Sequence, residues 1–317
     1  MESRYSCSEG GAGHALALEF AAQGLRVIAT ARSKSSLASL EAKGIETLLL
    51  DVTSLESINS LKAKVIQSTG GKLDILFNNA GISAYYPFII SCIIATLGSK
   101  SDVALVYEAP AIEVNHDRVH AMFDTNCFGL FNMVSAFTPL LLASVSDARH
   151  PPTIINTASV VSRIPFVFSA AYNASKAAVV SYSDTLRIEL APLGVKVVTL
   201  FMGEVSTSLF TPETINFGPQ SLYTVVEQGA KDRSRYHMEH SMSAPEFAKQ
   251  VVHEVLHKPG LGKGEFIWKG TNAWLVWLLN AIGWRKIFDG TVEGAVGFNK
   301  TTKESMYENS QRLVKQG

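Results

Sequence analysis

Short apolar runs alternate with longer segments of helical periodicity between residues 25 and 77. The apolar runs have the length of buried strands, and a glycine pair, Gly70-Gly71, ends the second helical segment. The predicted order is strand 25–31, helix 35–43, strand 47–52, helix 55–69 and strand 73–77. Strands joined through helices pair in parallel, because the crossover returns the chain to the same end of the sheet. We therefore predict an α/β fold with a doubly wound parallel sheet.

The later sequence continues this alternation. A long helix is predicted over 115–142, with Met122, Phe128 and Met133 among its core positions. Buried strands follow at 153–159, 194–201 and 265–268, and Ser243 with Glu246 predicts the capped start of another helix. The chain has 317 residues, 47% of them hydrophobic, which is enough to bury the core of one large domain.

Charge and cysteine content exclude several functional classes. Lysine plus arginine and aspartate plus glutamate number 28 each, and no basic tract predicts a nucleic-acid partner. The cysteines are scattered without metal-ligand spacing, as expected of reduced thiols in an intracellular protein. His253 and His257 are four residues apart without an accompanying acid, so no metal site is predicted. The first residues lack the apolar core of a signal peptide.

The glycine-rich stretch 6–13 runs directly into a helical segment that Gly24 ends. A glycine-rich turn at a helix start offers backbone N–H groups and a positive dipole end to a pyrophosphate. We therefore predict that Gly11 and Ala12 contact a dinucleotide. Residues 1–4 are not an apolar strand, so the first strand of the sheet is predicted to be truncated.

Ser159, Tyr172 and Lys176 form the most informative spacing in the chain. Ser159 follows an apolar run and is predicted to lie at a strand end, while Tyr172 and Lys176 are four apart and share one helix face. A phenol with an ordinary pKa near 10 is a poor acid at pH 7, and a nearby ammonium lowers that pKa. With a serine hydroxyl to hold a carbonyl, this set can move a proton on and off a carbinol oxygen.

These residues, with Asn78-Asn79-Ala80-Gly81 upstream and Asp51 before that, resemble the short-chain dehydrogenase/reductase family over roughly residues 5–210. The resemblance implies a Rossmann fold and a nicotinamide cofactor. It implies catalytic roles for Ser159, Tyr172, Lys176 and Asn126, with Asn126 bending its helix around a water and relaying protons. By the same resemblance, the cofactor contacts are Asp51 at the adenine, Asn79, Tyr172 and Lys176, and Val205 with Thr207 at the nicotinamide carboxamide.

Arg32 and Ser33 directly follow the predicted strand 25–31. Family members that prefer NAD usually carry an acidic residue at this strand end, whereas a cation and a hydroxyl favour the 2′-phosphate of NADP(H). We therefore predict an NADPH preference. The alternative is that Arg32 is only a solvated loop charge.

Two regions depart from the family pattern, namely residues 1–4, which are not an apolar strand, and residues 88–110. Residues 88–110 are an atypical insertion, either a flap near the site mouth or non-coding sequence translated in error. In the domain organisation that we predict, residues 1–210 form the cofactor-binding and catalytic core. Residues 211–317 supply the substrate loop and a C-terminal helical extension of the same domain.

The segment 273–288 is apolar on almost every side and carries three of the four tryptophans. Such a segment is a buried helix, a contact in a homo-oligomer, or an anchor on a membrane surface with tryptophans at headgroup depth. The corresponding locations are the cytoplasm, or the periphery of the endoplasmic reticulum or a lipid droplet.

The residues and the resemblance together predict an NADPH-dependent ketone reductase with a lipid-like or natural-product ketone substrate, in secondary metabolite biosynthesis. The segment 10–17, the sequence SAAYNASKAA and the apolar C-terminal segment are similar to fungal 1-acyldihydroxyacetone phosphate reductase-like members. That enzyme activity in lipid synthesis is one alternative. The other is a catalytically impaired relative that serves as a binding or scaffold protein.

Overall fold

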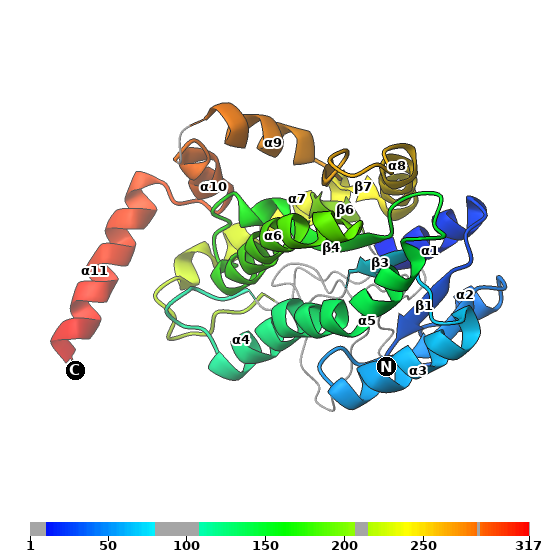
Figure 1. Ribbon diagram of the computed structural model, residues 1–317. Coiled ribbons are helices and arrows are strands. Elements are labelled where there is room, and N and C mark those ends of the chain that lie inside the picture. The colour runs from blue at the N-terminus through cyan, green and yellow to red at the C-terminus, as the bar shows by residue number, and fades with distance from the viewer. Residues whose placement is uncertain (1–10, 80–107, 207–214, 284–285, 317) are drawn as a thin grey trace.

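The computed structural model describes residues 11–79, 108–206, 215–283 and 286–316 (Figure 1). Every ladder between its strands is parallel, which confirms the predicted sheet type. The strands are β1 (Ile28–Ala31), β2 (Glu46–Leu49), β3 (Ile75–Asn78), β4 (Thr153–Ser159), β5 (Lys196–Met202), β6 (Val205–Ser206), β7 (Met242–Ser243) and β8 (Phe266–Lys269). β1 pairs with β2, β6 pairs with β7, and the main sheet has the order β3-β4-β5-β8.

Within the described ranges, no strand bridges β1 and β3, so the parallel strands form separate sheets. The predicted truncation of the first strand falls on residues 1–10, and most of the predicted insertion falls on 88–107. Both lie outside the described residues. Because β8 pairs with β5, residues after 210 share the main sheet with residues before it.

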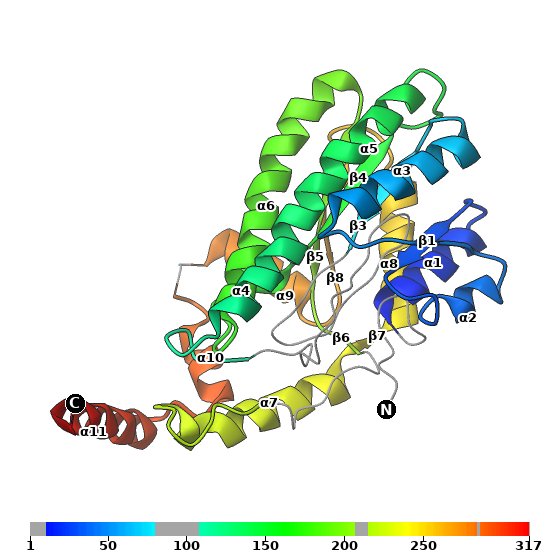
Figure 2. The same cartoon turned by 90° about the horizontal axis from the view of Figure 1, so that it is seen from below.

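Helices cover the main sheet on both faces (Figure 2). The helices are α1 (Ala12–Ala22), α2 (Ala38–Glu41), α3 (Leu55–Thr69), α4 (His116–Phe123), α5 (Leu130–Ser144), α6 (Ala170–Leu190), α7 (Glu227–His240), α8 (Ala244–His257), α9 (Ala273–Ile282), α10 (Asp289–Ala295) and α11 (Lys300–Gln316). α5 and α6 pack on strands of the main sheet, with α3 beside α5, while α1 packs against α8 on the other side.

Local sequence signals place α3 at its predicted bounds. The Ser54 side chain accepts a hydrogen bond from the backbone N–H of Ser57, which caps the helix start. Gly70 ends the helix in the left-handed conformation at φ 66°, which costs glycine little. β1 and α2 are shorter than predicted, and β2 begins one residue earlier than predicted and ends three residues earlier. A turn precedes α2 where the first helical residues were predicted. In this turn the Leu37 N–H donates to the Lys34 carbonyl at 3.0 Å.

The predicted helix over 115–142 is one helical run with a π-helical segment, η1 (Asp124–Gly129), between α4 and α5. Met122 and Met133 are buried as predicted, but Phe128 is exposed, because the wider turn changes which residues face the sheet. The run from 116 to 144 is long and apolar enough to cross a membrane by length and composition. Half of its most apolar window is buried and α5 packs on β3, as in the core helix of a globular domain.

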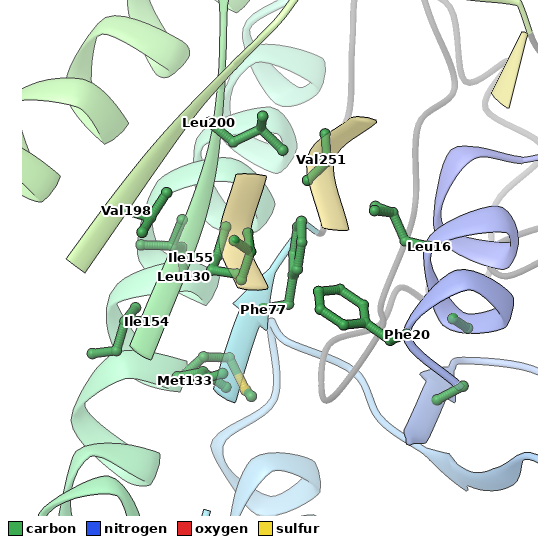
Figure 3. Close-up of a cluster of buried hydrophobic side chains, with 14 of the residues drawn as sticks. Leu16, Phe20, Phe77, Leu130, Met133, Ile154, Ile155, Val198, Leu200 and Val251 are labelled. Atoms are coloured by element: carbon green, nitrogen blue, oxygen red, sulfur yellow. The ribbon is translucent and has the colours of Figure 1, made fainter. Parts of the chain in front are cut away.

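The core lies between the main sheet and its helices (Figure 3). Phe20 of α1 meets Phe77 of β3 edge to face, with ring centroids 6.1 Å apart. Leu16 and Val251 lie beside this pair, and Ile155 and Val198 come from the neighbouring strands. This packing fixes the carboxyl ends of β3, β4 and β5 relative to one another, and the candidate site is built there.

A buried ion pair ties the start of the second described range to α7. The Arg233 guanidinium donates to both carboxylate oxygens of Glu108, at 3.1 and 3.3 Å, and its plane lies over the Phe166 ring. The Ala109 N–H donates to the Phe168 carbonyl at 3.0 Å. Residues 108–110, the last three of the predicted insertion, therefore pack into the body of the domain.

Candidate active site

Tyr172 and Lys176 lie on the face of α6 that packs against β4. The Lys176 ammonium is buried, donates to the Thr157 carbonyl at 2.8 Å, and stands 5.9 Å from the centre of the Tyr172 ring. The spacing of four residues brings the two groups together, as the sequence predicts. The hydrogen bond to β4 fixes the ammonium relative to the sheet, so its distance from the phenol is set by the fold.

Burial lowers the pKa of the Lys176 ammonium from its ordinary value to about 8, and the Cys127 thiol partly opposes that change. The cause is desolvation, which disfavours the charged form of an amine. Burial likewise raises the pKa of Cys127. At pH 7 the lysine is therefore mostly charged and the cysteine is a neutral thiol.

Ser159 is the last residue of β4, two residues beyond the carbonyl that holds Lys176. Its hydroxyl donates to the Met202 carbonyl on β5 at 3.3 Å and accepts from the Val161 N–H at 3.4 Å. Both contacts are long for hydrogen bonds. The strand-end position agrees with the prediction, and the hydroxyl stands at the same edge of the sheet as Thr157.

Asn126 is fully buried in η1 and donates from Nδ2 to the Ser175 hydroxyl at 3.0 Å. That hydroxyl donates in turn to the Tyr172 carbonyl at 2.8 Å. A π-helical turn leaves backbone groups out of the regular helical pattern and is often found at functional sites. Asn126 thus lies in a local change of helix geometry, and the water-bound bend that the resemblance implies stays a prediction.

Asn79 links β3 to β4 at the same sheet edge. Its side-chain amide oxygen accepts from the Thr157 hydroxyl at 2.7 Å, and the side chain of the neighbouring Asn78 donates to that of Asn156 at 3.0 Å. Thr157, Asn156 and Ser175 were not predicted as site residues. The signal was present for the first two, because polar side chains inside an apolar strand need buried partners.

The ends of β1 and β2 hold the other predicted cofactor contacts. Arg32 is half-buried, which lowers its pKa to about 10, while the nearby Asp51 carboxylate partly raises it. The Ser33 hydroxyl lies 2.7 Å from that of Ser36 and 3.1 Å from that of Ser35. Asp51 accepts from the N–H and the hydroxyl of Thr53, at 2.9 and 2.6 Å. Arg32 is thus partly buried, whereas the alternative prediction was a solvated loop charge.

The remaining predicted contacts lie on different elements. Gly11 is the N-cap of α1, is extended at φ −84° and ψ 153°, and has no side-chain cap. Val205 is buried in β6, just beyond the end of β5. Thr207 lies outside the described residues. Among the described residues, no group of three His, Cys, Asp or Glu side chains is placed to hold a metal ion.

This donor set suits a nicotinamide dinucleotide. An ammonium and a phenol stand together beside β4 of the main sheet, and the Arg32 guanidinium and the Ser33 hydroxyl follow the end of β1. Cations and hydroxyls are donors, which is what phosphate oxygens and ribose hydroxyls accept. The residues present therefore fit such a cofactor.

Comparison with known proteins also indicates a dehydrogenase. Residues 7–216 match the family model for short chain dehydrogenase. Over 203 residues the chain is 40% identical to an NADPH-dependent 1-acyldihydroxyacetone phosphate reductase of Schizosaccharomyces pombe, and the alignment covers 64% of this chain and 59% of that protein. It is 32% identical over 292 residues to the short-chain dehydrogenase virD of Hypocrea virens, covering 89% and 88%.

Among solved structures, a short-chain dehydrogenase from Streptomyces avermitilis matches the fold with a TM-score of 0.65. The two are 22% identical, and the match covers 93% of this chain and 97% of that one. The chain belongs to the short-chain dehydrogenase/reductase family, as its motifs predicted. It is therefore an oxidoreductase acting on CH–OH groups, in a family that uses NAD(P)H.

Proposed function

We propose that this protein reduces a ketone to an alcohol with NADPH. The observation that carries the proposal is the buried Lys176 ammonium held beside the Tyr172 ring. An oxidoreductase that converts a carbonyl to a carbinol must deliver a proton to oxygen as carbon is reduced. A phenol paired with a fixed cation is suited to that proton transfer.

When bound, the cofactor supplies the hydride that reaches the carbonyl carbon. Tyr172 gives its phenolic proton to the carbonyl oxygen, and the resulting phenolate is stabilised by the ammonium of Lys176. Ser159 exchanges its long hydrogen bond to Met202 for one to the substrate oxygen, which orients the carbonyl. Asn126 and Ser175 hold the main-chain carbonyl of Tyr172, which fixes η1 against α6. The role of Asn126 in returning a proton to the phenolate comes from the family resemblance.

Arg32 and Ser33 would hold the 2′-phosphate that distinguishes NADPH from NADH. The half-buried guanidinium next to Asp51 supports this assignment, because its position is restricted by its surroundings. The relative from Schizosaccharomyces pombe, NADPH-dependent by name, is a second support. Gly11, Ala12, Asp51, Asn79, Val205 and Thr207 complete the proposed cofactor contacts.

We assign the substrate to the class of lipid-like or natural-product ketones. The segment between Ser159 and Tyr172 is rich in apolar and aromatic residues. Phe168 of this segment packs against Phe217, Tyr223 and Phe298, which come from the C-terminal part of the chain. Several relatives are fungal short-chain dehydrogenases. The apolar cluster around Phe168 begins four residues before Tyr172 in the sequence, and we take it as support for a substrate with little charge near its ketone.

Substitution of Tyr172 by phenylalanine tests the reaction directly. We expect kcat to fall by about 10²–10⁴ for every ketone reduced, because the proton donor is removed while the ring stays. NADPH oxidation with a panel of apolar ketones is the measurement. Tyr182→Phe is the matched control, since Tyr182 lies on the same helix, stacked on Phe131.

Undiminished turnover in Tyr172→Phe would refute the proposed mechanism. NADPH fluorescence on mixing with the wild-type protein tests the alternative of a scaffold that has lost catalysis. An absence of binding at hundreds of micromolar would favour the scaffold and overturn the proposed function.

A second candidate is reduction of 1-acyldihydroxyacetone phosphate. The 40% identity over 203 residues to a reductase of that name favours it. The two candidates differ in the phosphate of the substrate. We would compare kcat/KM for the acyl-ketone phosphate with that for its dephosphorylated form. A strong preference for the phosphate would replace the broader substrate class with this one.

A further inference from the structure

Helix α9 exposes large apolar side chains over most of its surface. Trp274 is 65% exposed, Trp277 is 50% exposed and Ile282 is 75% exposed. Only Ala273 and Val276 are buried, where the helix packs on Val160. Figure 1 shows α9 along the outer edge of the molecule, and its buried side contacts β8, the edge strand of the main sheet. Of the three alternatives predicted for this segment, the buried helix is therefore wrong, and the homo-oligomer contact and the membrane-surface anchor are left.

The charged residues around α9 indicate which kind of surface its exposed apolar side chains contact. From 266 to 288 the sequence has Lys269, Arg285 and Lys286 but no aspartate or glutamate, although the whole chain is neutral. Lys269 contacts Glu254 at 3.4 Å, whereas Lys286 is exposed just beyond the helix. Tryptophans on an exposed apolar helix with a basic end are the pattern of a helix lying in a lipid headgroup layer.

A second copy of the chain is the other occupant to weigh. A stable protein interface uses about 20–30 residues from each partner. α9 has ten residues, two of which already face the core. The helix is thus small for a dimer contact, whereas an interfacial anchor needs only one apolar face and nearby positive charge.

We propose that α9 is an interfacial anchor that seats this protein on an anionic lipid surface. The helix would lie in the plane of the headgroups, with Trp274, Trp277 and Ile282 in the lipid and Lys286 at the phosphates. The anchor does not depend on the reaction that the site catalyses.

The position of α9 gives the anchor a consequence for the site. Its buried residues pack on Val160 of η2 (Val160–Ser162), the turn that directly follows Ser159. A protein seated through α9 therefore holds the Ser159 end of β4 close to the lipid surface. An apolar ketone dissolved in the membrane would then have a short path to the catalytic residues.

Co-sedimentation of the full chain with vesicles tests the anchor. We expect binding to phosphatidylcholine vesicles that contain phosphatidylserine, with a blue shift of tryptophan emission. The double variant Trp274→Ser/Trp277→Ser should bind at least about tenfold more weakly than wild type, because α9 then loses most of its apolar face. Lys286→Glu should weaken binding to anionic vesicles more than to neutral ones.

Tyr307→Ser is the matched control, because Tyr307 is 67% exposed on the separate helix α11 and should leave vesicle binding unchanged. The double variant should keep its circular dichroism and its turnover of a water-soluble ketone, which separates the anchor from the proposed reaction. The proposal is overturned if wild type does not sediment with vesicles, or if the double variant binds equally well. It is also overturned if the double substitution instead halves the mass in sedimentation equilibrium without lipid.

Discussion

Lys176 on α6 and Arg233 on α7 are both buried cations, yet their surroundings differ. Arg233 makes two charged hydrogen bonds to the Glu108 carboxylate and lies over Phe166. The hydrogen bond of Lys176 goes instead to a neutral carbonyl, that of Thr157. Burial lowers the pKa of Lys176 to about 8, and no salt bridge to a carboxylate is found for it among the described residues. The comparison favours a structural role for Arg233, and the surroundings of Lys176 suit the role in proton transfer that we propose for it.

Removing the paired cation should have the largest effect on stability. In Arg233→Met the Glu108 carboxylate is left buried without its partner, and burial already raises the pKa of that acid. We expect a loss of about 3–5 kcal/mol in the free energy of unfolding. Urea denaturation followed by circular dichroism measures it.

The double variant Arg233→Met/Glu108→Leu should recover much of that loss, because neither charge remains buried. If Arg233→Met leaves stability intact and abolishes only turnover, the distinction between the two cations fails.

The pH dependence of kcat/KM tests the role of Lys176, the cation without a carboxylate partner among the described residues. The Lys176 ammonium is the majority form below a pKa of about 8, so kcat/KM for ketone reduction should fall above that pH, approaching tenfold per unit. The free energy of unfolding should instead rise with pH between about 8 and the ordinary lysine pKa of 10.5. In that range Lys176 is protonated in the unfolded chain and mostly neutral in the folded one, so raising the pH favours the folded state. Initial rates from pH 6 to 10, with melting temperatures at each pH, measure both.

Lys176→Arg provides the control for this profile. A guanidinium stays charged throughout this range, so any remaining activity of the variant should lose the fall above pH 8. The same fall in both proteins would assign it to another group.

Arg32 differs from both Arg233 and Lys176, because its side chain is only half-buried and lies near the Asp51 carboxylate. If its charge recognises the 2′-phosphate, Arg32→Asp should lower the ratio of kcat/KM with NADPH to that with NADH by about tenfold or more. Stability should change little, since the side chain is partly solvated. Equal use of both cofactors by the wild type would remove this role.

Sequence reasoning succeeded where short-range signals decide the structure. The Ser54 cap and Gly70 fix α3, and the spacing of Tyr172 and Lys176 fixes their shared face. It failed where partners are distant in the chain. Glu108 and Arg233 are 125 residues apart, and Glu108 lies in the segment 88–110 that was predicted to be an atypical insertion. The exposure of Phe128 and of α9 depends on packing, which periodicity does not report.

The π segment η1 has a consequence for how relatives of this chain can vary in length. Such a segment holds one more residue than the α-helical turn it replaces. Loss of a single residue from Asp124–Gly129 would convert the segment to a regular α-helical turn and leave the facing of α5 relative to α4 nearly unchanged. Met133 and Phe137, now fully buried, would keep their places against the sheet. The same deletion inside α5 would instead rotate the residues that follow it by about 100°. A one-residue deletion in η1 should therefore be tolerated by the fold better than one inside α5.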